Sequence, residues 1–265
     1  MFCCECIDVN TVQRKIPILM YHQVDVERPK GSPMRGLVVS PATFSRQMGA
    51  LRSLGYRGLS MSDLEPYLRG EKDGKVFGIT FDDGYENNLR CALPVLKRCG
   101  FTSTCYVVAG LVGGCNSWDI ERGVVQVPLM NAQQLQTWVD AGQEVGSHTV
   151  THANLPELGE ALQAEEIMQS RLRLEALVKQ AQGVRHFCYP YGGFNEVSVN
   201  CVRAAGYATA TTTARGRISS LQAQNLLLLP RVLVSRTTTW MHLLLKCLTE
   251  YEDRRGRRHG PDAYS

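Results

Sequence analysis

The sequence lacks any hydrophobic segment long enough to cross a bilayer. Its leucine runs, at residues 226–229 and 243–245, are far shorter than the roughly 20 residues that a membrane-spanning helix needs. The first 15 residues also lack the apolar core of a secretory signal. We therefore expect a cytoplasmic protein.

A strong excess of positive or negative charge is missing as well. The 29 Lys and Arg residues nearly balance the 25 Asp and Glu residues, and the net charge of +4 gives no indication of a nucleic-acid partner. The exception is local, because Arg254, Arg255, Arg257 and Arg258 lie close together near the end of the chain. The composition predicts a flexible basic tail over residues 251–265. The alternative is a peripheral contact with an anionic membrane or a lipid-linked glycan.

Matched cysteine clusters are absent, although the chain contains ten cysteines. Cys3, Cys4 and Cys6 crowd the N-terminus, but no second cluster could complete a metal site with them. A chain of 265 residues does not need disulfides to fold, so we expect reduced thiols.

Internal repeats, low-complexity segments and linkers are also missing. The length suits one large α/β domain or two small ones, and nothing divides the chain. We predict an N-terminal extension over residues 1–15, a single domain over residues 16–250, and the basic tail.

Short apolar segments alternate with amphipathic ones along the whole domain. The segments expected to be strands are residues 16–22, 56–59, 76–81, 103–108, 143–147, 184–190, 207–211 and 227–234. Helices are expected between most of them. This alternation is typical of parallel βα units, arranged as an open sheet or as a barrel. In both arrangements the chemistry lies at the carboxyl ends of the strands.

Two neighbouring carboxylates follow one of these strands. Asp82 and Asp83 come directly after residues 76–81 and precede Gly84. Their side chains should diverge if the strand end is extended, so that one could bind a metal while the other faces a substrate water. The alternative is an ordinary Asp-Asp-Gly turn.

Two imidazoles follow another strand. His148 and His152 come directly after residues 143–147, at a spacing that allows both rings to reach one ion. One carboxylate and two imidazoles are a common ligand set for catalytic Zn²⁺, although Co²⁺, Ni²⁺ or Mn²⁺ would also fit. Together with a second carboxylate as base, this set indicates a metal-dependent hydrolase.

A third strand ends in Tyr189-Pro190-Tyr191-Gly192-Gly193. Proline fixes the turn, and the glycines allow the backbone to approach a ligand closely. The backbone N–H of Tyr191 could face a developing oxyanion. The alternative is a plain Pro-Gly turn. A long loop before the fourth helix carries Trp118 and Asp119.

These motifs, in this order, resemble the polysaccharide deacetylase family, the NodB-homology carbohydrate esterases. The segments that carry the resemblance are Thr80–Gly84, Ser147–His152 and Cys188–Gly192. The opening residues 18–22 and the segment 116–119 resemble the branch with the poly-β-1,6-N-acetylglucosamine deacetylases. The resemblance implies a distorted (β/α) barrel with fewer than eight regular strands. It also implies metal-dependent removal of acetyl groups from sugars.

Roles for single residues follow from the same resemblance. Asp82 would be the general base for a metal-activated water, Tyr191 would stabilise the oxyanion, and three residues would bind the metal. The metal ligands would be Asp83, His148 and His152. We expect the substrate, an N-acetylated saccharide, to contact Trp118, Asp119, Tyr189, Pro190 and Gly192.

Two positions depart from the family pattern. Cys188 stands where the third motif usually has an arginine that tethers the base, and Arg231 could reach Asp82 instead. For the catalytic acid, His242 is the only candidate near the expected late motif. A missing acid would favour an alternative function, a catalytically weak glycan-binding member of a biosynthetic complex. A deacylase of a non-sugar amide is a further alternative.

Overall fold

The computed structural model describes residues 14–219 and 225–259. The strands are β1 (Ile18–Tyr21), β2 (Gln23–Val24), β3 (Val38–Val39), β4 (Arg57–Leu59), β5 (Val76–Phe81), β6 (Thr104–Val107), β7 (Glu144–Ser147), β8 (His186–Cys188), β9 (Thr209–Arg215) and β10 (Leu229–Leu233). The α-helices are α1 (Pro41–Ser53), α2 (Met61–Leu68), α3 (Leu93–Cys99), α4 (Ala132–Asp140), α5 (Glu160–Leu177), α6 (Glu196–Ala204), α7 (Trp240–Leu248) and α8 (Tyr251–His259). Across these two ranges, no helix is long and apolar enough to span a bilayer.

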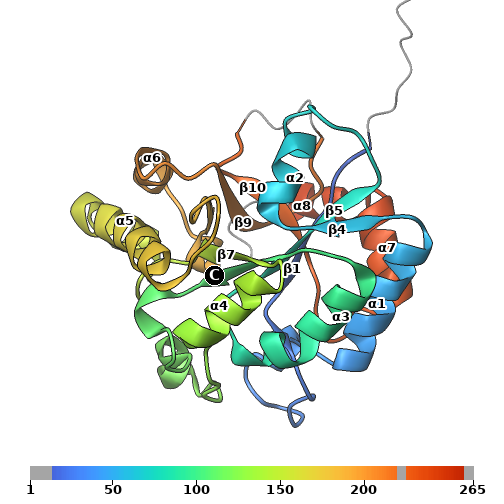
Figure 1. Ribbon diagram of the computed structural model, residues 1–265, viewed down its shortest axis with the longest axis horizontal. Helices are drawn as coiled ribbons and strands as arrows, with labels where there is room; N and C mark the ends of the chain where they lie inside the picture. The colour runs from blue at the N-terminus through green and yellow to red at the C-terminus, as the bar shows by residue number, and fades with distance from the viewer. Residues whose placement is uncertain (1–13, 220–224, 260–265) are drawn as a thin grey trace, which may run out of the picture.

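Seven parallel strands close into a barrel that is surrounded by helices (Figure 1). Their order is β1-β10-β9-β8-β7-β6-β5, and the pairing of β1 with β5 completes the ring. Parallel strands require crossover connections, which the intervening helices supply. The barrel confirms the predicted fold class and decides between the open sheet and the barrel in favour of the barrel.

The barrel is distorted because β4 occupies part of the gap between β5 and β6. The first half of β5 pairs with β4, from Val76 to Gly78. Only its last two residues, Thr80 and Phe81, pair with β6. At the amino end of the barrel, the short strand β4 is therefore inserted next to β5. At the carboxyl end, the barrel closes with seven strands.

Local sequence signals account for most helix starts. The Ser40 hydroxyl accepts from the backbone N–H of Thr43, and Asn131 forms a capping box with Gln134, as expected at these positions. Ser60 caps α2, and the Ser62 hydroxyl binds the carboxylate of Glu144.

The barrel interior is partly polar. Arg231 on β10 is fully buried there, with its guanidinium 5.9 Å from the centre of the Tyr106 ring. Outside the barrel, the helices pack on its wall through apolar and aromatic side chains such as Phe44, Phe81 and Trp138. A buried arginine needs a buried anionic partner. The partner of Arg231 is Asp82, which lies at the carboxyl end of the barrel.

The prediction of a flexible basic tail is wrong over residues 251–259, because these residues form helix α8. Glu252 is fully buried and lies 2.9 Å from the ammonium group of Lys246. Asp253 forms ion pairs with Lys15 at 2.9 Å and Arg217 at 2.8 Å. These contacts, two of them with distant parts of the chain, hold the segment as a helix. The rest of the predicted tail and residues 1–13 of the predicted N-terminal extension lie outside the described residues.

Candidate active site and metal centre

The candidate site residues lie in strained turns at the carboxyl ends of the strands. Four non-glycine residues there have left-handed backbones: Asp83 (φ 76°), Thr149 (φ 63°), His152 (φ 63°) and Tyr191 (φ 56°). Such conformations are costly for side-chain-bearing residues and concentrate at functional sites. The expectation that both carboxylates lie on an extended strand end is wrong, because Asp83 is in a left-handed turn. Here the turn makes the two side chains diverge.

Asp83, His148 and His152 converge on one point. The Nε2 atoms of His148 and His152 lie 3.5 and 3.4 Å from Asp83 Oδ1, and all three side chains are buried. Burial raises the pKa of Asp83, but hydrogen bonds from the two imidazoles outweigh it and hold the pKa well below its usual range. The carboxylate is therefore ionised at neutral pH.

The arrangement of these donors fits a metal ion. One oxygen or nitrogen donor atom from each residue lies within 4.8 Å of the other two. His148 Nδ1 lies 2.7 Å from the carbonyl oxygen of Cys188, which can only accept a hydrogen bond. Nδ1 therefore carries a proton. The Nε2 atom faces Asp83, and its lone pair could bind a cation once Nε2 gives up the proton that it shares with Asp83. The three residues could hold one divalent metal.

Asp82 is held by Arg231. The guanidinium donates from Nη1 to Oδ1 at 2.7 Å and from Nη2 to Oδ2 at 2.8 Å. The contact predicted between these residues is present. Burial raises the pKa of Asp82, but the charge of Arg231 and its hydrogen bonds outweigh it and leave the pKa below its ordinary value. The bidentate pair fixes the direction of the carboxylate.

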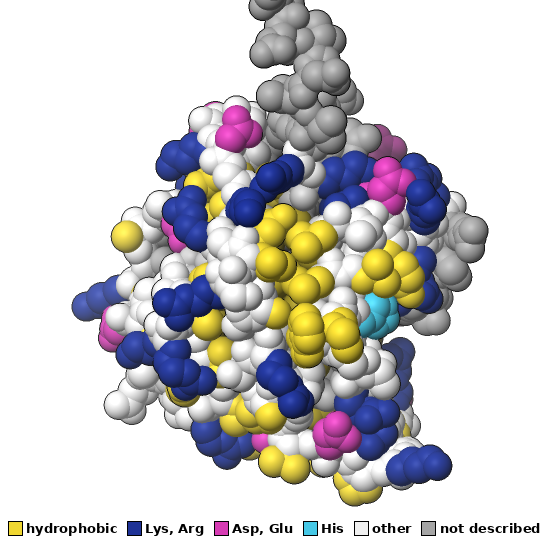
Figure 2. Space-filling view, turned by 90° about the vertical axis from the view of Figure 1, so that its right-hand side faces the viewer, with side chains coloured by type: hydrophobic (Ala, Val, Ile, Leu, Met, Phe, Trp, Pro, Cys, Tyr) yellow, Lys and Arg dark blue, Asp and Glu magenta, His cyan; other side chains and the backbone are white. Residues whose placement is uncertain are grey.

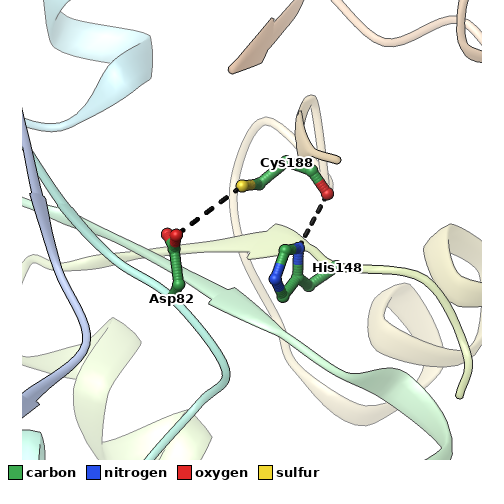
Figure 3. A group of neighbouring side chains, drawn as sticks. All are labelled: Asp82, His148 and Cys188. Carbon is green, nitrogen blue, oxygen red and sulfur yellow. Dashed lines mark hydrogen bonds between the residues drawn. The ribbon is translucent and has the colours of Figure 1, made fainter. Parts of the chain in front are cut away.

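Cys188 lies between the Asp82 carboxylate and the His148 imidazole and contacts both (Figure 3). Its sulfur is 3.8 Å from Asp82 Oδ2 and 3.2 Å from Arg231 Nη2, and its carbonyl oxygen binds His148. The arginine that binds Asp82 thus comes from β10, and it passes beside the Cys188 thiol.

His22 is a site residue that sequence reasoning missed. Its Nε2 lies 3.9 Å from Asp82 Oδ2, and its buried Nδ1 has no hydrogen-bond partner among the described residues. The signal was its place at the carboxyl end of the first strand. Because Tyr21 pairs with Phe81, the next residues of the two strands, His22 and Asp82, become neighbours. His242, by contrast, lies on α7 beside the ring of Tyr251 and does not line the cleft.

A cleft of about 400 Å³ opens over these residues, within the roughly 300–1,000 Å³ typical of ligand sites. Trp118, Asp119, Tyr189 and Tyr191 line it, as predicted for substrate contacts, together with His22. The Trp118 ring stacks on His152 with centroids 4.5 Å apart.

Pro190 and Gly192 are not among the described residues that line the cleft. Gly192 has a φ of +76°, and a Cβ atom there would lie 1.9 Å from the Thr213 hydroxyl. Its role in the structure is therefore to let the Tyr191 turn approach β9 closely.

The chain is thus a parallel α/β barrel whose cleft at the carboxyl end contains an Asp-His cluster that could hold a metal. The chain belongs to the polysaccharide deacetylase family, whose model matches residues 69–210, more than half of the 265 residues. This membership supports a glycan deacetylase.

Individual relatives agree with this family. The chain is 29% identical to the putative polysaccharide deacetylase YxkH of Bacillus subtilis, over 83% of this chain and 72% of the relative. It is 22% identical to the poly-β-1,6-N-acetyl-D-glucosamine N-deacetylase of Escherichia coli, over 88% of this chain but only 38% of that enzyme. The solved deacetylase PplD of Streptococcus pyogenes, in complex with acetate, has a TM-score of 0.77 and 27% identity, over 89% of this chain and 99% of PplD.

Proposed function

We propose that this protein removes the acetyl group from an N-acetylated saccharide and that it uses one Zn²⁺ ion held by Asp83, His148 and His152. The observation that carries the proposal is the pairing of two different carboxylates in one cleft. Asp83 faces the two imidazoles, while Asp82 is fixed by Arg231 and points to the same space. When bound, the metal would polarise the acetyl carbonyl and lower the pKa of a water molecule.

Asp82 is the general base in this proposal. Its carboxylate is ionised and oriented, and it takes the proton of the attacking water. Arg231 prevents the carboxylate from turning away, because both of its oxygens are bound to the guanidinium. The backbone N–H of Tyr191 donates to the oxyanion that forms on the acetyl group.

His22 is the proton donor to the leaving amine. It is the cleft imidazole that is not part of the metal cluster, and it lies beside Asp82. It replaces His242 in this role, because His242 is outside the cleft. A His22→Gln variant should keep its metal and lose about 10²–10⁴-fold in turnover. Unchanged turnover would remove His22 from the mechanism.

The aromatic rings at the cleft entrance support a saccharide substrate. Trp118 and Tyr191 flank His152, and Arg122 lies over the Tyr191 ring at 5.1 Å. Aromatic faces with nearby polar groups suit the apolar face and the hydroxyls of a sugar ring. PplD, the S. pyogenes relative with 27% identity, was solved with acetate, the product expected of a deacetylase.

Acetate release from N-acetylglucosamine oligomers tests the proposal. The protein treated with chelator should be inactive and should recover when Zn²⁺ is added, whereas Asp82→Asn should stay inactive with Zn²⁺. An N-acetylated peptide amide serves as a comparison substrate for a non-sugar deacylase. Release that is insensitive to the chelator, or confined to the peptide, would contradict the proposal.

The compartment is a separate proposal. We propose that the protein acts inside the cell on a saccharide precursor. The cysteines in the described ranges are all free thiols, which supports a reducing compartment. Fractionation of the native host cells tests this, and recovery from the medium would contradict it.

A further inference from the structure

Helix α7 lies on the side of the molecule opposite α5 (Figure 1), and it exposes a stripe of apolar side chains. Trp240, Met241, Leu245 and Leu248 are between 39% and 61% exposed. Met241, Leu245 and Leu248 are separated by four and three residues, so they lie in one row along the helix. The other side of α7 is buried through Leu243 and Cys247. The helix is therefore apolar on both its core side and its outer side.

The outer side of α7 differs from that of the other helix with exposed large apolar residues. Helix α5 exposes Leu162, Met168, Leu172 and Leu177, but it also carries four glutamates, at positions 160, 165, 166 and 175. Helix α7 has no acidic residue. An apolar residue among acids is ordinary on a soluble surface, whereas an apolar row without acids is not.

Basic side chains border the stripe at both ends. Arg46 and Arg236 share a surface hollow with Trp240 and Met241. At the other end, Lys75 and Leu54 share a hollow with Leu248. The exposed Glu250 is ion-paired with Arg254 at 3.2 Å, so it does not reverse this charge. Figure 2 shows a band of hydrophobic side chains on this side of the molecule, with Lys and Arg side chains around it.

We propose that this surface, defined by Trp240, Met241, Leu245, Leu248, Arg46 and Arg236 and called the α7 face, binds an anionic lipid bilayer. The helix would lie in the plane of the interface with its apolar row among the acyl chains near the headgroups. Tryptophan favours the membrane interface, and bordering basic residues are attracted to anionic headgroups. A nine-residue helix gives a shallow and reversible contact.

A second copy of the chain fits this surface less well. A symmetric dimer would place the same surface of both copies together, so their basic borders would face one another and repel. An anionic bilayer meets the apolar row and the basic border at the same time.

The α7 face adjoins the cleft. The backbone N–H of Arg236 donates to the carbonyl of Gly36 at 2.8 Å, and its guanidinium lies 3.4 Å from Glu27. The same loop carries Met34, which lines the cleft and is 42% exposed. A protein docked through α7 would therefore hold the cleft close to the bilayer surface.

Vesicle co-sedimentation of the full chain tests the proposal without any measurement of catalysis. Vesicles of phosphatidylcholine alone are compared with vesicles of equal parts phosphatidylcholine and phosphatidylglycerol. We expect binding to the anionic vesicles, weakened by salt, with a blue shift of tryptophan fluorescence that Trp240→Phe removes. Met241→Glu/Leu245→Glu should lower the partition coefficient about tenfold or more.

A matched control is available on α5. Leu162→Glu/Leu172→Glu makes the same kind of change at two exposed leucines on the opposite side, and it should bind vesicles as the unmodified protein does. Thermal unfolding of both double variants checks that they are folded. The proposal is overturned if both vesicle types bind equally or not at all, or if the two double variants bind alike. It is also overturned if light scattering shows a dimer that only the α7 variant dissociates.

Discussion

The two ends of the barrel each hold a buried carboxylate beside an imidazole, but the two clusters differ in their hydrogen bonds. At the amino end, Glu144 at the start of β7 and His186 at the start of β8 lie 3.4 Å apart. At the carboxyl end, Asp83 lies at nearly the same distance from His148 and His152. Residue types and burial alone therefore do not separate the two clusters.

The amino-end cluster is fully hydrogen-bonded. Glu144 accepts from the hydroxyls of Ser62 and Thr104 and from the backbone N–H of Ser62. Both ring nitrogens of His186 have a hydroxyl partner, Thr209 at 2.8 Å and Ser62 at 2.9 Å. This cluster anchors the start of α2, and none of its residues has a positive φ.

The carboxyl-end cluster has the opposite properties. It contains left-handed residues, opens to the cleft, and leaves His22 Nδ1 and His152 Nδ1 without hydrogen-bond partners among the described residues. Buried polar groups are normally satisfied, and unsatisfied ones mark strain or function. The comparison teaches that strain and unsatisfied donors, rather than residue types, distinguish the candidate site from a structural cluster.

The largest expected effect is a difference in bound metal between variants at the two ends of the barrel. His148→Ala should lose the bound metal and reduce acetate release to background, because it removes one of three protein ligands. His186→Gln should keep its metal, since the amino-end cluster is not expected to bind one. Metal analysis of the purified variants measures this. Full metal occupancy in His148→Ala would contradict the assignment.

Exchange of a carboxylate for an amide at each end gives the next contrast. Asp82→Asn should keep the metal and lose about 10²–10⁴-fold in turnover, because the base is removed. Glu144→Gln should retain its turnover but lose about 1–3 kcal/mol of unfolding free energy, because a buried hydrogen-bonded group is disturbed. Kinetics and urea unfolding of the two variants are compared. The contrast fails if both variants lose turnover equally.

Arg231 is expected to matter for stability as well as for turnover. Arg231→Met leaves the buried Asp82 without its charged partner, which should cost about 3–5 kcal/mol of unfolding free energy. Arg231→Lys keeps the charge but not the bidentate contact, so it should be milder in stability and still impaired in turnover. Denaturant unfolding measures the difference. A stability of Arg231→Met equal to that of the unmodified protein would show that the pair is not required.

The smallest effect is a pH dependence at the amino end. Burial lowers the pKa of His186, so the unfolded chain, with a histidine pKa of about 6.5, binds this proton more readily. The contribution of His186 to stability is therefore complete above pH about 6.5 and falls as the pH drops below it. His186→Gln should show a shallower loss of unfolding free energy below that pH. Parallel curves for the two proteins would contradict this.

Much of the fold and site could be predicted because parallel strands bring their carboxyl ends together. Strand ends alone placed Asp82, Asp83, His148 and His152 in one region, and the departure from the family pattern at Cys188 indicated Arg231 as the partner of Asp82. His22 received no role, because it has no partner nearby in sequence. Its neighbour Asp82 arrives through the β1–β5 pairing, which no local pattern reveals.

Helix α8 was missed for a similar reason. Its residues are mostly charged and include Gly256, so composition favoured a flexible tail. The helix is held by ion pairs of Asp253 with the distant residues Lys15 and Arg217, and by the pair of Glu252 with Lys246 on α7. Gly256 lies so close to β9 that a Cβ atom would be 2.0 Å from the Arg215 carbonyl oxygen. Tertiary packing overrides composition here.

The left-handed backbones at Asp83, Thr149, His152 and Tyr191 have an evolutionary consequence. Each costs on the order of 1–3 kcal/mol that the surrounding packing must offset. A lineage that no longer depends on the reaction would gain stability by relaxing these turns, for example through glycine or through a shift to negative φ. Retention of all four in a related barrel would therefore indicate sustained selection. Their backbone angles could distinguish working descendants of this barrel from ones that have drifted into other roles.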